Sequence, residues 1–493
     1  MTKITLLLLL FPIFSFSQWT QIGYDIDGEN EFDHSGWSTS ISSDGSIVAI
    51  GAKDNDSNGV SSGHVRVYEN ISGIWNQIGA DIDGDFVNDL FGFSVSLNSN
   101  GNILAVGAHT NNGNGTNSGQ VRVFENVSNT WTQIGSDIYG EAAFDTSGVS
   151  ISLSSDGTII AIGAPSNTGI NGAVSGHVRV FKNISGVWTQ IGEDIDGEAS
   201  GDNFGDSVSL NSNGTIVGIG APINDGVNGT ASGHVRIYEN ISGTWTQIGV
   251  DIEGEAAYDG FGSATSLNSD GNIIAIGAEK NDGIGPFSGH VRVYENIRGV
   301  WTQLGLDIDG EVGDALGASV SLNSNGNIVA IGSPSNNNGQ GKVGIYQNIA
   351  GTWTRIDSNI DGEAAGDGSG SSVSLSSDGS TVVIGANGND GNGSDSGHVR
   401  VYTNLVLSIE DNTFGRKFMI YPNPSVGLSI IQLGESYNEV SVNIFNVLGN
   451  QVSAHTFSDT NVIDLDTQQF TAGVYFVKVV SGTKKATVKL VIK

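Results

Sequence analysis

The chain has 493 residues, 72 of them glycine and none cysteine, and a formal charge of −32 at pH 7. The length allows two or three domains, the absence of cysteine excludes disulfides, and this charge repels nucleic-acid phosphates and anionic lipids while attracting cations. Because 38% of the residues are hydrophobic and occur in short regular runs, the composition indicates a folded, turn-rich β protein.

Residues 1–17 have the pattern of a secretory signal peptide. Lys3 precedes an apolar run of about ten residues, and Ser15 and Ser17 lie around a cleavage point before Gln18. No later segment approaches the roughly 20 apolar residues that a membrane helix needs. We therefore expect an exported, soluble mature protein without a membrane span.

A repeat follows the signal segment. Tryptophan recurs at intervals of 52 to 57 residues, and each copy opens a variant of the sequence WTQIG, which defines seven units beginning at Trp19, Trp75, Trp131, Trp188, Trp245, Trp301 and Trp353. Such a period indicates a repeat architecture in which each unit stacks on its neighbours.

Each unit contains four strand signals. In the third copy these are residues 148–155, the apolar run 158–165, residues 177–181 and residues 188–192, separated by D-G, N-G and S-G turns. Short strands bounded by such turns favour hairpin-connected antiparallel sheet. One sheet cannot cover both faces of the apolar run, whereas radial stacking of sheets can, so we predict an all-β fold with a seven-bladed β-propeller over residues 19–404.

The phase of the repeat predicts how the ring closes. The mature chain begins on a fourth strand, residues 19–23, and the last unit stops after its third strand, residues 398–402. We expect these two segments to pair, which hides strand edges that would otherwise invite aggregation.

The repeat resembles the FG-GAP repeat of integrin-type propellers. The matching residues are Phe91-Gly92, Phe204-Gly205 and Phe261-Gly262 before strand one, and the Gly-Ala-Pro runs 163–165 and 220–222 after strand two. In that family calcium binds an Asp/Asn-rich loop between strands one and two. Here that loop is only SSDG or NSNG, so the family's calcium site is not expected in this chain.

A different composition begins after a linker at residues 405–413. Residues 414–493 carry seven Lys/Arg against five Asp/Glu, so the negative charge belongs to the propeller, and their alternating strands predict a small β-sandwich. The segment closely resembles the type A sorting domain of the type IX secretion system of Bacteroidetes. The motif residues are Tyr421, Pro422, Asn423, Pro424, Gly473, Tyr475 and Lys489.

That resemblance implies an export route and a final location for the protein. It implies Sec export, passage across the outer membrane with the type IX machinery as partner, and a final location in the medium or on the outer surface of a Gram-negative, Bacteroidetes-like cell. In the family the domain is commonly cleaved, and the cargo is released or attached to surface polysaccharide.

An acidic segment recurs seven times after the fourth strand, as DIDGE in three copies. It fails the EF-hand pattern because glycine directly follows the second aspartate. Two alternatives stay open. Calcium could bind the aspartates of the segment, with Glu198 or Asp202 completing an oxygen cage in the third copy, or the carboxylates could cap backbone N–H groups and meet arginines. The aspartates concerned are Asp25, Asp27, Asp81, Asp83, Asp194, Asp196, Asp307 and Asp309.

Two further positions recur in strand three. The histidines cannot converge on one metal ion, since each belongs to its own blade, and we expect a structural role; they are His64, His177, His234, His290 and His398. The arginines two residues later are expected to pair with acidic groups within or between blades; they are Arg66, Arg122, Arg179, Arg236, Arg292 and Arg400.

The loops from strand two to three and the acidic connectors should emerge on one face, which is therefore the better candidate for binding. The clearest departures from the repeat are His34, Trp37, His109 and Tyr139. Because the acids recur with the repeat, we expect no catalytic residue, cofactor or resident metal, and a monomeric, non-enzymatic propeller that binds a protein or glycan in adhesion. The alternatives are a structural surface protein without a specific ligand and a carbohydrate-active propeller enzyme.

Overall fold

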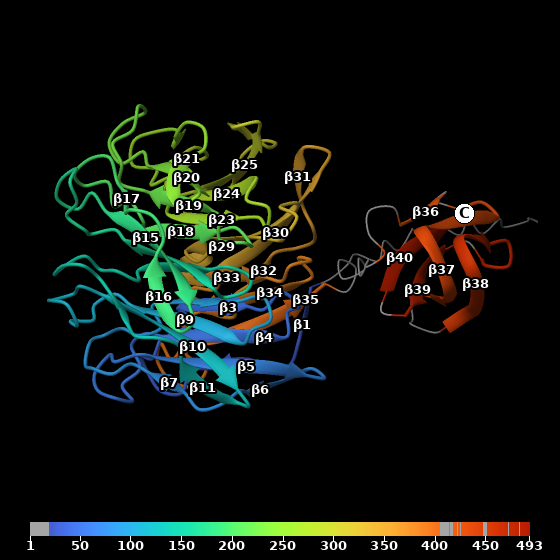
Figure 1. The fold of residues 1–493 in the computed structure, drawn as a ribbon, viewed down its shortest axis with the longest axis horizontal. Coiled ribbons are helices and arrows are strands. Elements are labelled where there is room, and N and C mark those ends of the chain that lie inside the picture. The colour runs from blue at the N-terminus through green and yellow to red at the C-terminus, as the bar shows by residue number, and fades with distance from the viewer. Residues whose placement is uncertain are drawn as a thin grey trace, which may run out of the picture. The chain divides into compact units, whose positions relative to one another are not determined.

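The computed structural model describes residues 19–404, 414, 418–421, 423, 425–446, 451–471, 473–482 and 484–493. The expected signal peptide, the linker 405–413, and Pro422 and Pro424 lie outside the described residues. The chain divides into two compact units, residues 1–404 and 405–493 (Figure 1). No helix in the described residues is long and apolar enough to cross a membrane.

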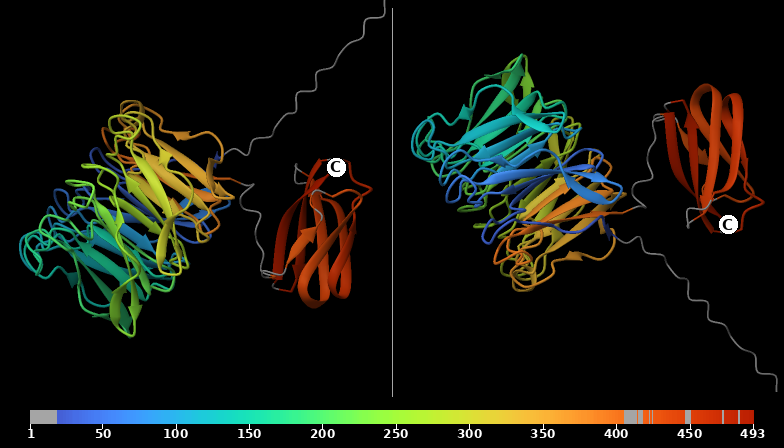
Figure 2. Two further views of the ribbon diagram at one scale, coloured as in Figure 1. Left: turned by 90° about the horizontal axis from the view of Figure 1, so that it is seen from above. Right: turned by 90° about the horizontal axis from the view of Figure 1, so that it is seen from below.

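The first unit is a seven-bladed β-propeller, with seven five-stranded antiparallel sheets among its described residues (Figures 1 and 2). The innermost strands are β3 (Ser38–Ile41), β8 (Ser94–Leu97), β13 (Ser150–Leu153), β18 (Ser207–Leu210), β23 (Ala264–Leu267), β28 (Ser319–Leu322) and β33 (Ser372–Leu375). The second strands are β4 (Ile47–Ala52), β9 (Ile103–Ala108), β14 (Ile159–Ala164), β19 (Ile216–Ala221), β24 (Ile273–Ala278), β29 (Ile328–Ser333) and β34 (Thr381–Ala386).

The outer half of each blade is a longer hairpin. Its third strands are β5 (His64–Ile71), β10 (Gln120–Val127), β15 (His177–Ile184), β20 (His234–Ile241), β25 (His290–Ile297), β30 (Lys342–Ile349) and β35 (His398–Thr403). Six fourth strands follow in the described residues: β6 (Ile74–Gln77), β11 (Thr130–Gln133), β16 (Val187–Gln190), β21 (Thr244–Gln247), β26 (Val300–Gln303) and β31 (Thr352–Arg355). A short helical turn, α1 (Asn336–Gly339), lies in the loop of the sixth blade.

The acidic connector adds a fifth strand that the repeat pattern did not predict. Its Ile-Asp pair, or the equivalent, rejoins the third strand of its own blade beside the fourth, as His64↔Asp83 and Val65↔Ile82 show in the first blade. These two-residue strands are β2 (Ile26–Asp27), β7 (Ile82–Asp83), β12 (Ile138–Tyr139), β17 (Ile195–Asp196), β22 (Ile252–Glu253), β27 (Ile308–Asp309) and β32 (Ile360–Asp361). The outer edge of each blade is therefore made of two short pieces.

The N-terminal segment supplies the outer edge of the last blade. The strand β1 (Thr20–Gln21) pairs with β35 through Thr20↔Thr403 and Gln21↔Tyr402, and β2 continues along the same strand. The Ile22 N–H also donates to the carbonyl of Val401, at 2.8 Å. The first and last units of the repeat thus form one sheet.

A second closure lies at the end of the channel that faces the tight turns. The N–H of one serine per blade donates to the carbonyl of the equivalent serine in the next blade at 2.8 to 3.1 Å, through Ser43, Ser99, Ser155, Ser212, Ser269, Ser324 and Ser377 back to Ser43. These bonds form an unbroken ring around the channel, so each blade is held to both neighbours by its backbone.

The core lies between blades. Val48, Ala49 and Ile50 of β4 are at most 1% exposed although successive side chains point to opposite faces of the sheet. Ala49 packs in one cluster with Leu104 of the next blade, whereas Val48 and Ile50 pack with the last blade. From the second to the seventh repeat tryptophan, each indole N–H donates to a carbonyl of the preceding blade, as Trp75 does to Ile22 at 2.8 Å.

The second unit is a five-stranded antiparallel sheet of β36 (Met419–Tyr421), β37 (Leu428–Asn446), β38 (Gln451–Asp466), β39 (Gly473–Ser481) and β40 (Lys484–Ile492). The long strand β37 pairs with β36 and β38 in its first part and with β38 and β39 in its second. The unit has its own core, which includes Ile431, Val442, Val477 and Leu490, each fully buried.

Deleting residues 19–23 should lower the melting temperature strongly. The deletion exposes the edge of β35 and removes Trp19, which is 7% exposed; loss of one buried tryptophan side chain alone costs about 3–5 kcal/mol. Thermal unfolding followed by circular dichroism measures the effect. The control Tyr24→Ala, at a side chain 91% exposed, should leave the melting temperature unchanged, and an unchanged melting temperature in the deletion variant would contradict the closure.

Candidate functional site

The strand-three arginines bind the acidic connector of the preceding blade, as the sequence predicted. Arg66 donates to the carbonyl of Asp27 at 2.6 Å, and its guanidinium lies 3.6 Å from the carboxylate of Glu29. Arg122, Arg179 and Arg400 repeat this contact. Each guanidinium is nearly buried, so its carboxylate compensates a charge that would otherwise be costly to desolvate.

In the fourth and fifth blades the arginine contacts two connectors at once. Arg236 pairs with Glu198 of the preceding connector and with Asp251 of its own, at 3.1 Å in the second case. Arg292 pairs in the same way with Glu255 and Asp307. In these two blades the first aspartate and the glutamate of the acidic segment are therefore partners of arginine, whereas the first aspartate of other segments accepts from a glutamine four residues earlier, as Asp81 does from Gln77.

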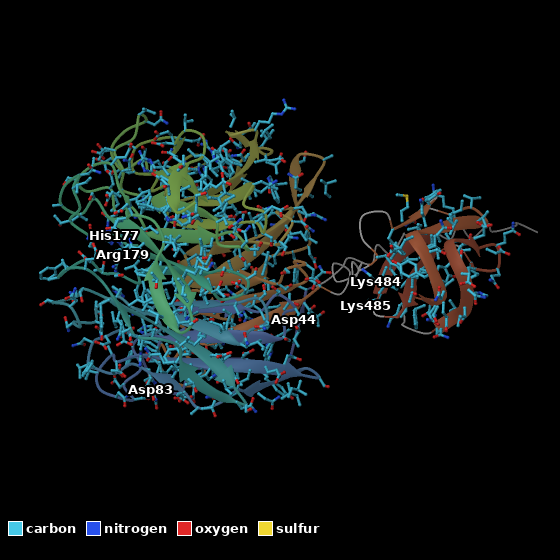
Figure 3. All side chains as sticks on the ribbon, in the orientation of Figure 1. Asp44, Asp83, His177, Arg179, Lys484 and Lys485 are labelled. Atoms are coloured by element: carbon cyan, nitrogen blue, oxygen red, sulfur yellow. The ribbon has the colours of Figure 1, made fainter. Side chains whose placement is uncertain are left out.

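The strand-three histidines lie in the same pockets. Within the described part of the chain, five groups bring one histidine, one aspartate and one glutamate within 4.8 Å of one another, and each histidine is 1% exposed. His177 Nδ1, for example, lies 3.7 Å from Asp194; Figure 3 labels His177 and Arg179 on β15. The histidines do not share one site, as expected, but sequence reasoning missed their grouping with acids from two connectors.

The chain itself indicates what this histidine position does. In the second blade Gln120 occupies it and donates to Asp137 at 2.8 Å, and in the sixth blade Lys342 occupies it and binds Asp314 at 2.8 Å. A charged lysine donates hydrogen bonds but cannot ligate a metal. The position therefore places a hydrogen-bond donor or a neutral ring beside a carboxylate, which is a structural role.

Burial, followed by the neighbouring arginine of each, lowers the pKa of His64 and His177 to about 4, against the opposing effect of Asp81 and Asp194 respectively. Both imidazoles are therefore neutral at neutral pH. Their pockets hold one positive guanidinium each, which disfavours a bound cation.

Three acids of the oxygen cage considered for the third connector make other contacts. Glu198 binds Arg236, and the carboxylate of Asp202 accepts the backbone N–H of Ala199 at 2.9 Å. Asp194 accepts from Gln190 at 2.7 Å. Glu198 is thus an arginine partner and Asp202 a backbone cap, as one interpretation expected, whereas Asp194 and Asp196 make neither contact.

A different arrangement lies at the end of the channel that faces the long loops. The first residues of all seven innermost strands, and in six blades the residue before them, line an open cavity of about 250 Å³, which we call the channel mouth. Its lining includes Trp37, Phe93, Val149, Asp206, Ala318 and Ser371, which follow the glycine of the FG-type motif in six different blades. The chemical character of this position therefore differs between blades.

Aromatic side chains gather on one side of the channel mouth. The ring centroids of Trp37 and Phe93 are 5.5 Å apart, and those of Phe93 and His109 are 4.0 Å apart. Lys53 Nζ lies 4.1 Å from the centroid of the Trp37 ring and pairs with Asp54, which also binds His34 at 2.9 Å. Sequence reasoning identified His34, Trp37 and His109; it missed Phe93 and Lys53.

Asp206 lies at the channel mouth in the fourth blade. Burial raises its pKa to about 6, an effect that Lys280 opposes and Glu279 reinforces. Burial and Lys53 lower the pKa of His109 to about 4, and its buried Nδ1 has no hydrogen-bond partner among the described residues. Asp206 departs from the repeat at the same position as Trp37. Comparing the residue at this position across the units could have identified Asp206 from the sequence.

Tyr139, the fourth departure, lies elsewhere. It replaces the second acid of the connector in the second blade, and its hydroxyl donates to Asp137 at 2.7 Å. An added methyl group at Gly113 would collide with its ring. Tyr139 therefore fills space under a loop and does not belong to the channel mouth.

The described sorting-motif residues lie in the second unit. Tyr421 ends β36, Gly473 begins β39, and Lys489 belongs to β40. The hydroxyl of Tyr475, a residue 8% exposed, donates to the carbonyl of Thr471 at 3.0 Å. The Asn423 side chain accepts the N–H of Val491 at 2.9 Å, so this asparagine ties the motif to the last strand.

Both units of the chain match known protein families. Residues 419–493 match the secretion system C-terminal sorting domain, and residues 82–124 and 361–402 match the FG-GAP repeat. The chain therefore carries FG-GAP repeats in its propeller and a type IX sorting domain, which directs export to the cell surface or the medium in Bacteroidetes-type bacteria. No curated protein matches the sequence.

Solved structures with a similar fold include the following three. A putative 6-phosphogluconolactonase from Bacteroides uniformis has 13% identity and a TM-score of 0.46 over 66% of this chain and 86% of its own. A periplasmic gluconolactonase from Pseudomonas aeruginosa has 12% identity and a TM-score of 0.46 over 90% and 99%. A GH74 xyloglucanase from Xanthomonas campestris has 11% identity and a TM-score of 0.44 over 84% and 59%.

The buried histidines should make stability depend on pH. The pKa of His64 and His177 is about 4 in the folded chain and 6.5 ordinarily, so the unfolded chain binds protons first as the pH falls. Their contribution to the free energy of unfolding should decrease from pH 6.5 to 4 by up to about 1.4 kcal/mol per histidine per pH unit. Urea denaturation across this range measures it.

The variant His64→Gln with His177→Gln, which copies the natural Gln120, should have a flatter pH profile than the wild type. The exposed His455 provides a control, since His455→Gln should leave the profile unchanged. Identical profiles for the wild type and the double variant would show that the histidines are not buried as neutral rings.

Proposed function

We propose that this protein is a non-enzymatic binding propeller, exported by the type IX system, that takes a glycan at the channel mouth in adhesion to carbohydrate surfaces. The main support for this proposal is that the residues lining the channel mouth differ from blade to blade. The strand-three arginines and the inner serines recur almost unchanged around the ring because they hold blades together, whereas the lining of the mouth combines aromatic, aliphatic, acidic and small residues. Such variation on a rigid frame is typical of ligand recognition.

The chemistry of the mouth favours a sugar. Trp37 and Phe93 offer aromatic faces on which the C–H-rich face of a pyranose ring can pack. Asp206 accepts hydrogen bonds when ionised, and the hydroxyl groups of Thr39 and Ser371, which line the same cavity, both donate and accept. Hydroxyl groups satisfy both kinds of partner, and an open cavity admits a chain that continues beyond the bound ring.

One observation favours the enzyme alternative. A carboxyl group with a pKa near 6 can act as a general acid, and Asp206 feels the charge of Glu279. Hydrolysis of a glycosidic bond ordinarily requires two carboxyl groups that flank the bond. Among the described residues that line the cavity, Asp206 is the one carboxylic acid, so binding without cleavage is the better supported function.

Substitution of the aromatic pair should abolish binding. Immobilised full-length protein is screened against a glycan array, and the best ligand is measured by calorimetry. Trp37→Ala and Phe93→Ala should each weaken binding about 30-fold, as for an aromatic residue at the centre of an interface. Phe86→Ala, at a connector side chain 66% exposed, should bind as the wild type does.

Two outcomes would contradict the proposal. One is the absence of any saturable glycan binding, and the other is wild-type affinity in both aromatic variants. Analysis of the bound oligosaccharide by mass spectrometry tests the enzyme alternative separately, because cleavage that disappears in Asp206→Asn would establish catalysis.

Export should depend on the second unit. Because residues 405–493 form a separate compact unit with its own core, removing residues 414–493 should leave a folded propeller that accumulates in the periplasm. Cell fractionation and immunoblotting measure its location. Truncated protein in the medium or on the surface at the wild-type level would contradict a role of this unit in export.

A further inference from the structure

The loops between strands two and three contain a repeated asparagine and serine whose side chains close the loop. In the first blade Asn55 Oδ1 accepts the N–H of Ser57 at 2.9 Å, and Ser62 Oγ donates to the carbonyl of Asn55 at 3.2 Å. The second, fifth and seventh blades repeat both bonds. In these four blades the loop satisfies its own polar groups.

The third and fourth blades differ. Their loops, residues 165–176 and 222–233, are one residue longer than the first-blade loop, residues 53–63. Asn167 Oδ1 and Ser175 Oγ are buried and have no hydrogen-bond partner among the described residues, and the same is true of Ser232 Oγ in the fourth blade. Asn167 is 6% exposed and both serines are 0% exposed, so water in bulk does not compensate them.

These oxygens converge on one glycine in each loop. A methyl group added at Gly169 would lie 3.2 Å from Asp196 Oδ1, 3.2 Å from Ser175 Oγ and 3.3 Å from Asn167 Oδ1. At Gly226 in the fourth blade the same three positions recur: a methyl group would touch Glu253 Oε2 and lie 2.9 Å from Ser232 Oγ and 3.5 Å from Asn224 Oδ1. Two blades thus build the same oxygen-lined cradle.

The cradle contains acceptors without matching donors. A carboxylate and an amide oxygen only accept hydrogen bonds, and a serine hydroxyl can donate one. Glu253 Oε2 has no hydrogen-bond partner among the described residues. Burial, followed by the charge of the adjacent Asp194 or Asp251, raises the pKa of Asp196 and Glu253. A buried group of acceptors needs a cation or a donor to offset its desolvation.

We propose that the third and fourth blades each bind a calcium ion, through Asn167, Ser175 and Asp196 in one and Asn224, Ser232 and Glu253 in the other. Calcium takes six to eight oxygen ligands in flexible geometry, so backbone carbonyls and water complete each shell. With one carboxylate per site, the affinity belongs to the extracellular range of about 10⁻⁴ to 10⁻³ M.

The sequence left open that calcium binds the aspartates of all the acidic connectors. The proposed sites use only the second acid of the connector, and only in the third and fourth blades. The first aspartate of each connector is engaged elsewhere, as Asp194 is with Gln190 and His177, and the histidine pockets already hold a guanidinium. In the second blade Tyr139 replaces the second acid and packs on Gly113, so that blade cannot bind an ion in this way. The proposed sites require the longer loop and the second acid together.

Calorimetric titration of the full mature chain with calcium chloride tests the proposal. We expect two ions per chain and a calcium-dependent rise of the melting temperature that EDTA removes. Asp196→Asn with Glu253→Gln keeps the side-chain shapes and should abolish both effects. Gly169→Ala with Gly226→Ala should do the same by filling the cradles, since neither glycine has a positive φ that alanine would resist.

Gly283→Ala is the matched control, because Gly283 occupies the equivalent position in the fifth blade and Asn281 Oδ1 there already accepts its N–H. This variant should bind calcium as the wild type does. Each double variant should melt as the wild type does in EDTA, which establishes that it is folded. No saturable binding up to about 10 mM calcium, or unchanged binding in Asp196→Asn with Glu253→Gln, would overturn the proposal.

Discussion

The burial of the second strand on both faces is the constraint on which the rest of the structure depends. Residues such as Val48, Ala49 and Ile50 need apolar cover on two sides, and a single blade supplies none of its own. Each blade is therefore stable only between two others, and the series must close. The pairing of β1 with β35 and the ring of serine backbone bonds are the two means of closure.

The strong negative charge is compatible with this packing because many of the carboxylates lie at the interfaces between neighbouring blades. The connector glutamate of one blade meets the buried arginine of the next, so a cation that would be costly to desolvate alone is compensated across the interface. His64 and His177 are neutral because burial and the neighbouring guanidinium both lower their pKa. The acidic segments thus hold neighbouring blades together, and this structural role does not require a ligand.

Function must then be sought where the units differ. A residue repeated in nearly every blade serves what all blades share, namely their mutual contacts. The channel mouth differs in almost every blade, and the loops of the third and fourth blades differ in length and in the partners of Asn167 and Ser175. The proposed glycan site and the proposed calcium sites both rest on such departures, and they lie at different places in the ring.

The sequence by itself determined the repeat, the all-β class, the number of blades and the character of the sorting domain, because turn residues, alternation and a fixed period are local properties of the chain. It also indicated that the arginines meet the acids. The sequence did not predict the fifth strand of each blade, since a two-residue Ile-Asp strand carries no periodic signal of its own.

Only the tertiary structure decided which residues meet. Trp37, Phe93 and Asp206 are far apart in sequence, yet they share the channel mouth because innermost strands of a closed ring all begin at the same end of the channel. Likewise, Asp196 reaches Asn167 and Ser175 because the connector folds back to pair with β15. The physical reason is common to both cases: ring closure and strand pairing set the distances between units, and no local pattern in the chain encodes those distances.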